Sequence, residues 1–540
     1  MGRKEHKEIA HMEWDDFEGS LQAAKRGTKG GAAAEKTMRE YFGDEEYEYL
    51  QKLADHARVV RSRGPAMGNV VFLHGIMGAN LITVEKDGDE DIVWVNFMRL
   101  IAGQIKRLML SPDGSREDDQ EYMVKPGTLD KRTYARAILW LRAWWNVQPF
   151  AYDWRKDIDV ASNALASFIR DKFADQPVNL VAHSMGGLVC RNFIRLHRDL
   201  WDGMHGDSGS RGGRLIMLGT PNYGSFAIPQ TLTGVEKTVR LLAVADLKND
   251  LSGILEILDT FVGSYQMLPS PAKIPPSSQV IYRKESWGDF PVSEVHLNRA
   301  FQFHADLDKE NTIDPERMIY IAGCNRETIS GLRYVSPGEF DYTITHEGDG
   351  RVPHALGLLQ EVPAYYVDEA HGDLPKNEKV LSAVHELLEH GRTSVLSDRP
   401  IISRAVAVAG AHWRRPADEE QVKNELKNIA SRTAGKESTP EEVRIAEEII
   451  MRSVMGQDKP VSRKTKERKK KEPPLPKKPL SLHIEVVNGD ITQIKAPVVV
   501  IGHYKGIAPV SAGAEGVIDN ALGFWITRAG QRGMIGADLG

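Results

Sequence analysis

The sequence predicts an α/β protein whose main domain is a parallel β-sheet with helices on both faces. From Asn69 onward, short continuous apolar runs recur between longer amphipathic segments. Glycines flank several of these runs, a pattern typical of strands that are buried on both faces of a parallel sheet. The predicted strands are residues 70–73, 147–152, 178–182, 215–218, 318–322 and 364–367.

The segments between these strands have the periodicity of helices. Residues 161–173 and 187–197 each follow a predicted strand and are expected to cover the sheet. Residues 377–390 carry their apolar side chains on one face, and Gly391 is a natural stop after them. We expect this helix to close the domain.

The bulk composition excludes several classes of protein. Hydrophobic residues make up 41% of the 540 and charged residues 27%, the balance of a soluble globular protein with two or three domains. The net charge of −5 is small, so no nucleic-acid partner is expected. Cys190 and Cys324 are the two cysteines, which makes a disulfide framework improbable, and both are predicted to be buried small hydrophobes. With no signal-peptide pattern and no apolar stretch of about 18 residues, a cytoplasmic location is expected.

Composition shifts along the chain predict five regions. A basic, proline-rich stretch around Arg468–Lys471 reads as a tether, with attraction to an anionic membrane or a nucleic acid as the alternatives. A new α/β pattern begins after it, and its short length favours a fragment of a longer protein over a very small domain. The regions are a helical extension (1–65), the sheet domain (66–395), a helical region (396–460), the linker (461–480) and a partial α/β domain (481–540).

A candidate nucleophile lies between the third predicted strand and its helix. Ala182-His183-Ser184-Met185-Gly186 resembles the G-x-S-x-G elbow, with alanine in place of the first glycine. Ester cleavage needs a nucleophile on a sharp turn, where small neighbours permit strained backbone angles and close approach of the substrate. We therefore predict Ser184 as the nucleophile.

A glycine-containing loop follows the first strand, at His74-Gly75-Ile76-Met77. Acyl transfer places negative charge on the carbonyl oxygen, and preorganised backbone amides stabilise that charge. We assign one amide of the oxyanion hole to Ile76, with Met77 as the alternative. The other is expected from Met185, directly after the nucleophile.

Two later loops supply the remaining catalytic groups. Asp349 lies between glycines that allow a loop carboxylate to turn inward, and Asp341 and Glu347 are its competitors. His371 directly follows the last predicted strand and would act as the general base. The order Ser, Asp, His along the chain is that of the α/β-hydrolase fold.

Several further motifs resemble those of the lecithin:cholesterol acyltransferase-like lipases, over roughly residues 69–392. The resemblance implies an acyl-ester substrate, often a phospholipid or neutral lipid, and a mobile lid in about 225–315. Substrate contacts are expected from His74, Met77 and Tyr223. The chain departs from the family at His74, where proline is common, and at Arg351, which replaces threonine. The motifs are YDWR at 152–155, LGTPNYGS at 218–225, SYQMLP at 264–269 and GDGRVP at 348–353.

A second, weaker resemblance concerns residues 482–540. The segment Val487–Thr492 and the apolar run after it are similar to macro-type domains, such as the amino-terminal domain of leucine aminopeptidases. We favour a scaffolding role over ADP-ribose binding for this region.

These features together predict a lipase or phospholipase that cleaves a carboxylic ester through an acyl-enzyme on Ser184. No cofactor or metal is expected, and the predicted partners are a lipid or acyl-ester substrate and, transiently, a membrane surface. The alternatives are an acyltransferase that uses an alcohol acceptor, and a hydrolase-fold module for binding or signalling.

Overall fold

The computed structural model describes residues 9–24, 29–174, 176–206, 212–309, 312–401, 413–414, 420–435 and 438–457. All of them lie in one compact unit, Met1–Lys464. The predicted linker and the macro-like segment fall outside the described residues. Within the described residues, no helix is both long and apolar enough to cross a bilayer.

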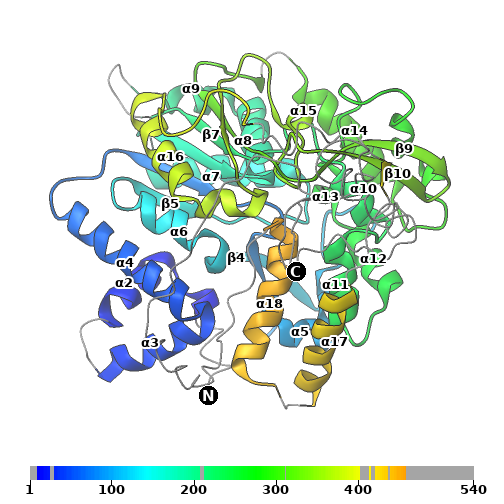
Figure 1. Ribbon diagram of the computed structural model, residues 1–540, viewed down its shortest axis with the longest axis horizontal. Helices are drawn as coiled ribbons and strands as arrows, with labels where there is room; N and C mark the ends of the chain where they lie inside the picture. Colours follow the sequence, from blue (N-terminus) through cyan, green and yellow to red (C-terminus); the bar gives the residue numbers. More distant parts are fainter. Residues whose placement is uncertain are drawn as a thin grey trace, which may run out of the picture. The chain divides into compact units, whose positions relative to one another are not determined.

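A six-stranded parallel sheet forms the centre of this unit, as predicted (Figure 1). The strands are short, and the four inner ones are almost entirely buried because their side chains meet helices on both faces. The strand order is β11-β8-β7-β6-β1-β5. The strands are β1 (Asn69–Leu73), β5 (Asn146–Phe150), β6 (Val178–His183), β7 (Leu215–Leu218), β8 (Met318–Gly323) and β11 (Ala364–Val367).

The strand order reverses direction between β1 and β6, and this places the predicted elbow beside the predicted oxyanion loop. From β1 the chain first builds outward to β5 and then returns to the other side of β1 with β6. Leu73 and Ala182 are in register at the carboxyl ends of β1 and β6. Ligands of open α/β sheets bind at such a switch point, beyond the carboxyl ends of the strands.

Helices cover both faces of the sheet, and alternation along each strand decides which side chains they meet. Leu73 packs in one hydrophobic cluster with helices α7 and α8. Phe72 packs in the other cluster with α6 and α16. These helices are α6 (Lys131–Leu141), α7 (Ile158–Phe173), α8 (Met185–Leu196) and α16 (Glu378–His390).

The amino-terminal helices are α2 (Trp14–Ala24), α3 (Lys29–Phe42) and α4 (Asp44–Arg61). They share the second cluster, where Phe17 and Tyr47 are fully buried together with Phe72. Arg136 of α6 pairs with Glu46 of α4 at the same boundary. The amino-terminal helices therefore extend the core beside α6 (Figure 1).

Two smaller antiparallel sheets were not predicted. One is formed by β2 (Ala79–Glu85), β3 (Glu90–Trp94) and β4 (Tyr122–Leu129), and the other by β9 (Thr328–Ser336), β10 (Glu339–Thr345) and β12 (Trp413–Arg414). The first sheet braces the loop after β1, since the indole of Trp94 donates to the carbonyl of Met77 at 2.8 Å.

Short helices follow β7 in the region predicted as a lid. They are α10 (Ala227–Leu232), α11 (Lys237–Ala245), α12 (Leu251–Asp259), α13 (Val262–Tyr265) and α14 (Glu294–Leu307). Other short helices are α5 (Phe97–Ile101), α9 (Arg198–Gly203), α15 (His354–Gly357) and the 3₁₀ segments Gln104–Leu108, Gln279–Tyr282, Lys284–Trp287 and η5 (His371–Lys376).

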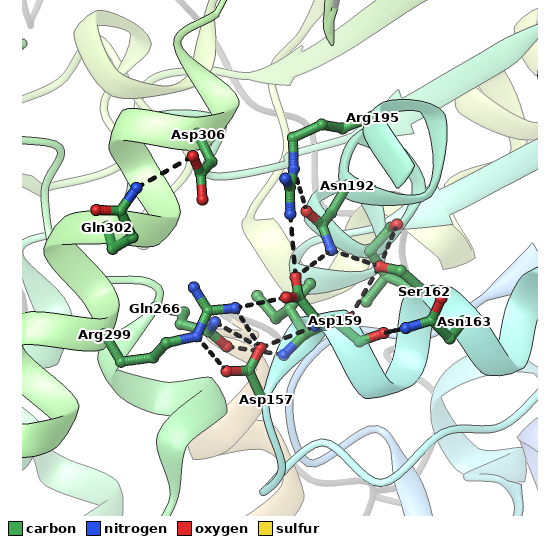
Figure 2. A network of polar contacts seen from close by, with 12 residues as sticks. Asp157, Asp159, Ser162, Asn163, Asn192, Arg195, Gln266, Arg299, Gln302 and Asp306 are labelled. Atoms are coloured by element: carbon green, nitrogen blue, oxygen red, sulfur yellow. Dashed lines mark hydrogen bonds and ion pairs between the residues drawn. The ribbon is translucent and has the colours of Figure 1, made fainter. Parts of the chain in front are cut away.

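A polar network joins α14 to the start of α7 and to α8 (Figure 2). The guanidinium of Arg299 binds the carboxylates of Asp157 and Asp159. Asp159 also accepts from the side-chain amide of Asn192 on α8 at 2.8 Å. The inserted helices are thereby tied to the helix that follows the predicted nucleophile.

The described part of the chain ends with two helices that pack against each other, α17 (Glu420–Ala434) and α18 (Pro440–Met455). Both lie in the predicted helical region. A capping box of Thr439 and Glu442 starts α18, and Gly456 ends it with φ 66°. Both helices lie beside α11 and α5 (Figure 1).

Candidate active site

Ser184 occupies a strained turn between β6 and α8. Its φ of 55° and ψ of −126° are rare for a residue with a side chain, and its amide donates to Leu218 at 2.9 Å. Glycines make room for the turn: a Cβ on Gly186 would lie 2.6 Å from the carbonyl oxygen of His74, and one on Gly187 would lie 2.0 Å from the hydroxyl of Thr220. This geometry is the one expected of a nucleophile elbow, and the role of Ser184 as nucleophile stays a prediction.

The structure brings Asp349 and His371 together. Nδ1 of His371 lies 2.7 Å from Oδ2 of Asp349, and the amide of His371 donates to the carbonyl of Asp349 at 2.8 Å. The other carboxylate oxygen accepts from the amides of Arg351 and Val352 at 2.9 and 2.8 Å. Burial alone would raise the pKa of Asp349, but the charge and hydrogen bond of His371 and the two amides lower it.

Gly219 of the LGTP motif allows the loop after β7 to lie close to Asp349 and His371. It has φ 59°, and a Cβ there would lie 2.9 Å from Oδ2 of Asp349 and 3.0 Å from Nδ1 of His371. A side chain at this position would therefore collide with the hydrogen bond between the two residues.

The two competing carboxylates lie elsewhere. Asp341 belongs to strand β10 and forms an ion pair with Arg333 on β9. Glu347 is exposed on the loop after β10. Among these three acids, Asp349 is the one whose carboxylate binds the His371 imidazole.

Ser184 and His371 line one cavity together with Ile76 and Met77. The cavity holds about 100 Å³, below the roughly 300–1,000 Å³ of typical small-molecule sites. Most of its wall is apolar, and Arg351 and Glu236 add an ion pair of 2.9 Å at one side. The other lining residues include Ile228, Val239, Leu242, Leu258, Met267, Val352, Val454 and Met455.

The two predicted oxyanion donors both lie near Ser184, since Ile76 lines the same cavity and Met185 is the next residue. Met185 is fully buried as the first residue of α8, where an amide has no acceptor within its own helix. Ile76 lines the cavity from a turn closed by the hydrogen bond from the amide of Gly78 to the carbonyl of Gly75, at 3.1 Å. Their role as donors stays a prediction.

A buried chain of hydrogen bonds, absent from the sequence-based prediction, connects the oxyanion loop to His371. The amide of Gly75 donates to the hydroxyl of Tyr134 at 2.9 Å, and this hydroxyl lies 2.9 Å from Nδ1 of His183. Nε2 of His183 lies 3.0 Å from the carbonyl of His371. Burial, with the nearby charge of His371, lowers the pKa of His183 to about 3. The neutral ring therefore donates through Nε2 and accepts from Tyr134 through Nδ1.

The predicted substrate contact of His74 needs correction. Its Nδ1 donates to the carbonyl of Gly75 at 2.6 Å, and its Nε2 accepts from the amide of Tyr152 at 3.2 Å. The ring is fully buried and stacks on Tyr152 at 4.0 Å. Burial lowers the pKa of His74 to about 4. The ring of His74 therefore stabilises the backbone of the loop through these hydrogen bonds, and His74 is not among the described residues that line the cavity.

Of the other two predicted substrate contacts, Met77 lines the cavity. Tyr223 is not among the described residues that line it. Tyr223 is buried, its amide donates to Leu356 at 2.8 Å, and Lys273 lies over its ring.

Arg155 of the YDWR motif has a structural role. The side chain is fully buried and binds Asp153 at 2.7 Å and Glu117 at 3.0 Å. It also donates to the carbonyl of Leu108 at 2.7 Å. Within the described part of the chain, no three His, Cys, Asp or Glu side chains are arranged to hold a metal ion.

The parallel sheet, the strained serine between β6 and α8, and the chain order Ser184, Asp349, His371 define an α/β-hydrolase fold. Residues 139–380 match the family described as lecithin:cholesterol acyltransferase. The match confirms the predicted resemblance over that segment and supports an esterase-type enzyme. A comparison with curated proteins found no match.

Several solved structures are similar to this chain. A Tle4–Tli4 complex has 14% identity, covering 59% of this chain and 98% of the other, with a TM-score of 0.34. The mature lipase BlEst2 of Bacillus licheniformis has 15% identity, covering 60% and 93%, with a TM-score of 0.31. Phospholipase PlaB from Legionella pneumophila has 15% identity, covering 48% and 40%, with a TM-score of 0.22.

Proposed function

We propose that the protein is a serine hydrolase that cleaves a carboxylic ester of a lipid-like substrate through an acyl-enzyme. One observation carries the proposal: Ser184 and His371 line the same largely apolar cavity, while Asp349 binds the far nitrogen of His371. The family match over residues 139–380 supports an acyl ester of a lipid as the substrate class.

In the proposed reaction, Nε2 of His371 accepts the proton of the Ser184 hydroxyl as its oxygen attacks the ester carbonyl. Asp349 fixes the tautomer of the imidazole and stabilises the imidazolium. The amides of Ile76 and Met185 bind the oxyanion of the tetrahedral intermediate. His371 then gives its proton to the departing alcohol, which leaves an acyl group on Ser184.

Water resolves the acyl-enzyme by the same route in reverse. His371 takes a proton from the water as it attacks the acyl carbonyl, and returns that proton to Ser184 when the carboxylic acid leaves. The apolar wall of the cavity suits the hydrocarbon part of the substrate, and transient contact with a lipid surface would deliver it.

The first test is turnover of p-nitrophenyl esters by the full chain and by Ser184→Ala, His371→Ala and Asp349→Asn. Triad members act as a unit, so Ser184→Ala and His371→Ala should each lower kcat by about 10⁴- to 10⁶-fold. Asp349→Asn should lower it by about 10⁴-fold, since the imidazole would lose its fixed tautomer. Folding of each variant is checked by circular dichroism.

Labelling with a fluorophosphonate provides a second readout and a matched control. Wild type should be labelled and Ser184→Ala should not. Ser264 lines the same cavity, so Ser264→Ala should still be labelled. A folded wild type that neither turns over esters nor takes the label would overturn the proposal in favour of a hydrolase-fold binding or signalling module.

Acyl transfer to an alcohol is the second candidate, because the matching family is described as an acyltransferase. An alcohol would then replace water in attacking the acyl-enzyme. Product analysis with an added long-chain alcohol decides between them: a transferase forms the new ester in excess of free acid even though water is abundant.

A further inference from the structure

The carboxyl end of α18 forms part of the cavity wall. Val454 and Met455 line the cavity that also contains Ser184 and His371. Both residues lie beyond the family match, which ends at 380, and beyond the predicted sheet domain. A segment appended to the hydrolase fold therefore completes the wall of its candidate site.

Backbone contact brings α18 close to His371. Gly372 follows the histidine directly, and a Cβ there would lie 2.5 Å from both Cβ and the carbonyl oxygen of Met455. The side-chain amide of Gln457 donates to the carbonyl of Gly372 at 2.9 Å. The missing side chain at Gly372 is what allows the helix end to approach so closely.

Polar contacts fix the helix end to both sides of the cavity. The carbonyl of Ser453 accepts from the guanidinium of Arg351, two residues after Asp349. The hydroxyl of Ser453 lies 3.1 Å from that of Thr238 on α11. Arg351 also pairs with Glu236 at 2.9 Å, so one guanidinium joins the catalytic loop, α11 and α18.

A second anchor holds the middle of α18. Glu447 pairs with Arg132 of α6 at 2.8 Å and accepts from the amide of Phe97 at 3.0 Å. The ion pair is largely buried, with side-chain exposures of 13% and 9%. Helix α18 is therefore held both at its middle and at its end, which fixes the position of Met455. A cavity wall that limits substrate size has to be fixed in this way.

We propose that Met455 and Val454 are specificity-determining residues that limit the length of the acyl chain accepted by the site. This inference rests on the proposed function. The cavity of about 100 Å³ is well below the roughly 300–1,000 Å³ of typical small-molecule sites, so with α18 in this position it suits a short acyl group. Shortening either side chain extends the cavity toward α18.

The test is the chain-length profile of kcat/KM for p-nitrophenyl acetate, butyrate, octanoate and palmitate with the full chain. Wild type should prefer the shorter esters. Met455→Ala should raise the octanoate-to-butyrate ratio at least fivefold, and Val454→Ala with Met455→Ala should raise it further. Met455→Phe, which fills the cavity, should lower the ratio, and Met455→Leu should leave it within twofold of wild type.

Met451→Ala is the matched control, because Met451 is buried on the same helix and is not among the described residues that line the cavity. An octanoate-to-butyrate ratio that stays within twofold in both alanine variants, or that changes equally in Met451→Ala, would overturn the inference. Fluorophosphonate labelling separates this result from failure of the proposed function, in which Ser184 of the wild type would take no label at all.

Discussion

The hydroxyl of Tyr134 lies 2.9 Å from Nδ1 of His183 and accepts the amide hydrogen of Gly75 at the same time. One phenol on α6 thus touches the loop of the predicted oxyanion hole and the residue that precedes the predicted nucleophile. Through His183, it also supports the backbone of His371. Tyr134 and His183 are both fully buried, so these bonds are made without competition from water.

We expect Tyr134→Phe to lower kcat, because the hydroxyl of Tyr134 helps to position Gly75 and His183 beside the candidate catalytic residues. The change leaves the amide of Gly75 and Nδ1 of His183 without a partner, and an unsatisfied buried group costs about 1–3 kcal/mol. If this strain falls on the transition state, kcat should drop about tenfold to a hundredfold while KM changes little. Steady-state kinetics on a soluble ester measures both.

Tyr342→Phe is the control for this prediction, because Tyr342 is equally buried but belongs to the β9–β10 hairpin. Equal losses of kcat in the two variants would show that the phenol of Tyr134 has no special connection to the catalytic groups.

Gly187→Ala should destabilise the elbow. The new Cβ would lie 2.0 Å from the hydroxyl of Thr220, and overpacking of this kind costs about 1–3 kcal/mol. Gly19→Ala is the matched change, since a Cβ on this exposed residue of α2 meets nothing within 4 Å. It should raise the free energy of unfolding by about 0.5–1 kcal/mol. Denaturation followed by tryptophan fluorescence compares the two, and a Gly187→Ala protein as stable as wild type would contradict the prediction.

Arg155→Lys should not preserve the YDWR motif. A lysine has a single ammonium in place of the fork that binds Asp153, Glu117 and the carbonyl of Leu108. Breaking a buried ion network from one side costs about 3–5 kcal/mol, so the melting temperature and soluble yield should both fall. Arg333→Lys, at the exposed pair with Asp341, should change neither. Wild-type melting of Arg155→Lys would show that charge alone is sufficient at this position.

The buried ammonium of Lys131 should make the stability of the protein depend on pH. Burial lowers the pKa of its ammonium from 10.5 to about 7, although Trp14 lies 5.1 Å from it and Thr128 accepts at 3.0 Å. The unfolded chain keeps the ordinary pKa, so between about pH 7 and pH 10 it binds more protons than the folded protein. Stability from this group therefore rises with pH across that interval.

Melting temperatures at pH 7 and pH 9 test the sign. The difference between the two should be more positive in wild type than in Lys131→Met, which removes the titrating group. The same difference in both proteins would mean that Lys131 keeps its proton throughout this range, held by the aromatic rings and the acceptors around it.

Much of the central sheet could be predicted because most of its strands contain a continuous apolar run. The predicted bounds of 215–218 and 364–367 are those of β7 and β11. The two antiparallel sheets escaped prediction because most of their strands mix charged or turn-forming residues with apolar ones. Strand β3 begins with Glu90 and Asp91, and β4 contains Pro126 and Gly127.

The candidate site was predictable where a residue needs a special backbone, and less so where only a side-chain direction matters. Ser184 and Asp349 are recognisable from the glycines around them. His74 belongs to the same loop motif as Ile76, yet the sequence does not reveal that its ring points beneath the loop. Tyr134 reads as an ordinary core position of an amphipathic helix. Met455 follows the predicted end of the sheet domain by about 60 residues, and local patterns carry no signal over that distance.

Strand β6 lies inside the sheet, hydrogen-bonded to β1 on one edge and to β7 on the other, and all six of its residues are buried. Amide hydrogens in such a strand exchange with solvent only when the domain unfolds as a whole. The serine at its end should therefore keep its orientation through partial openings at the periphery, such as fraying of α18 or of the β9–β10 hairpin. Heat should abolish the reactivity of Ser184 at the same temperature at which the sheet itself is lost, and recovery on cooling should follow the return of the sheet.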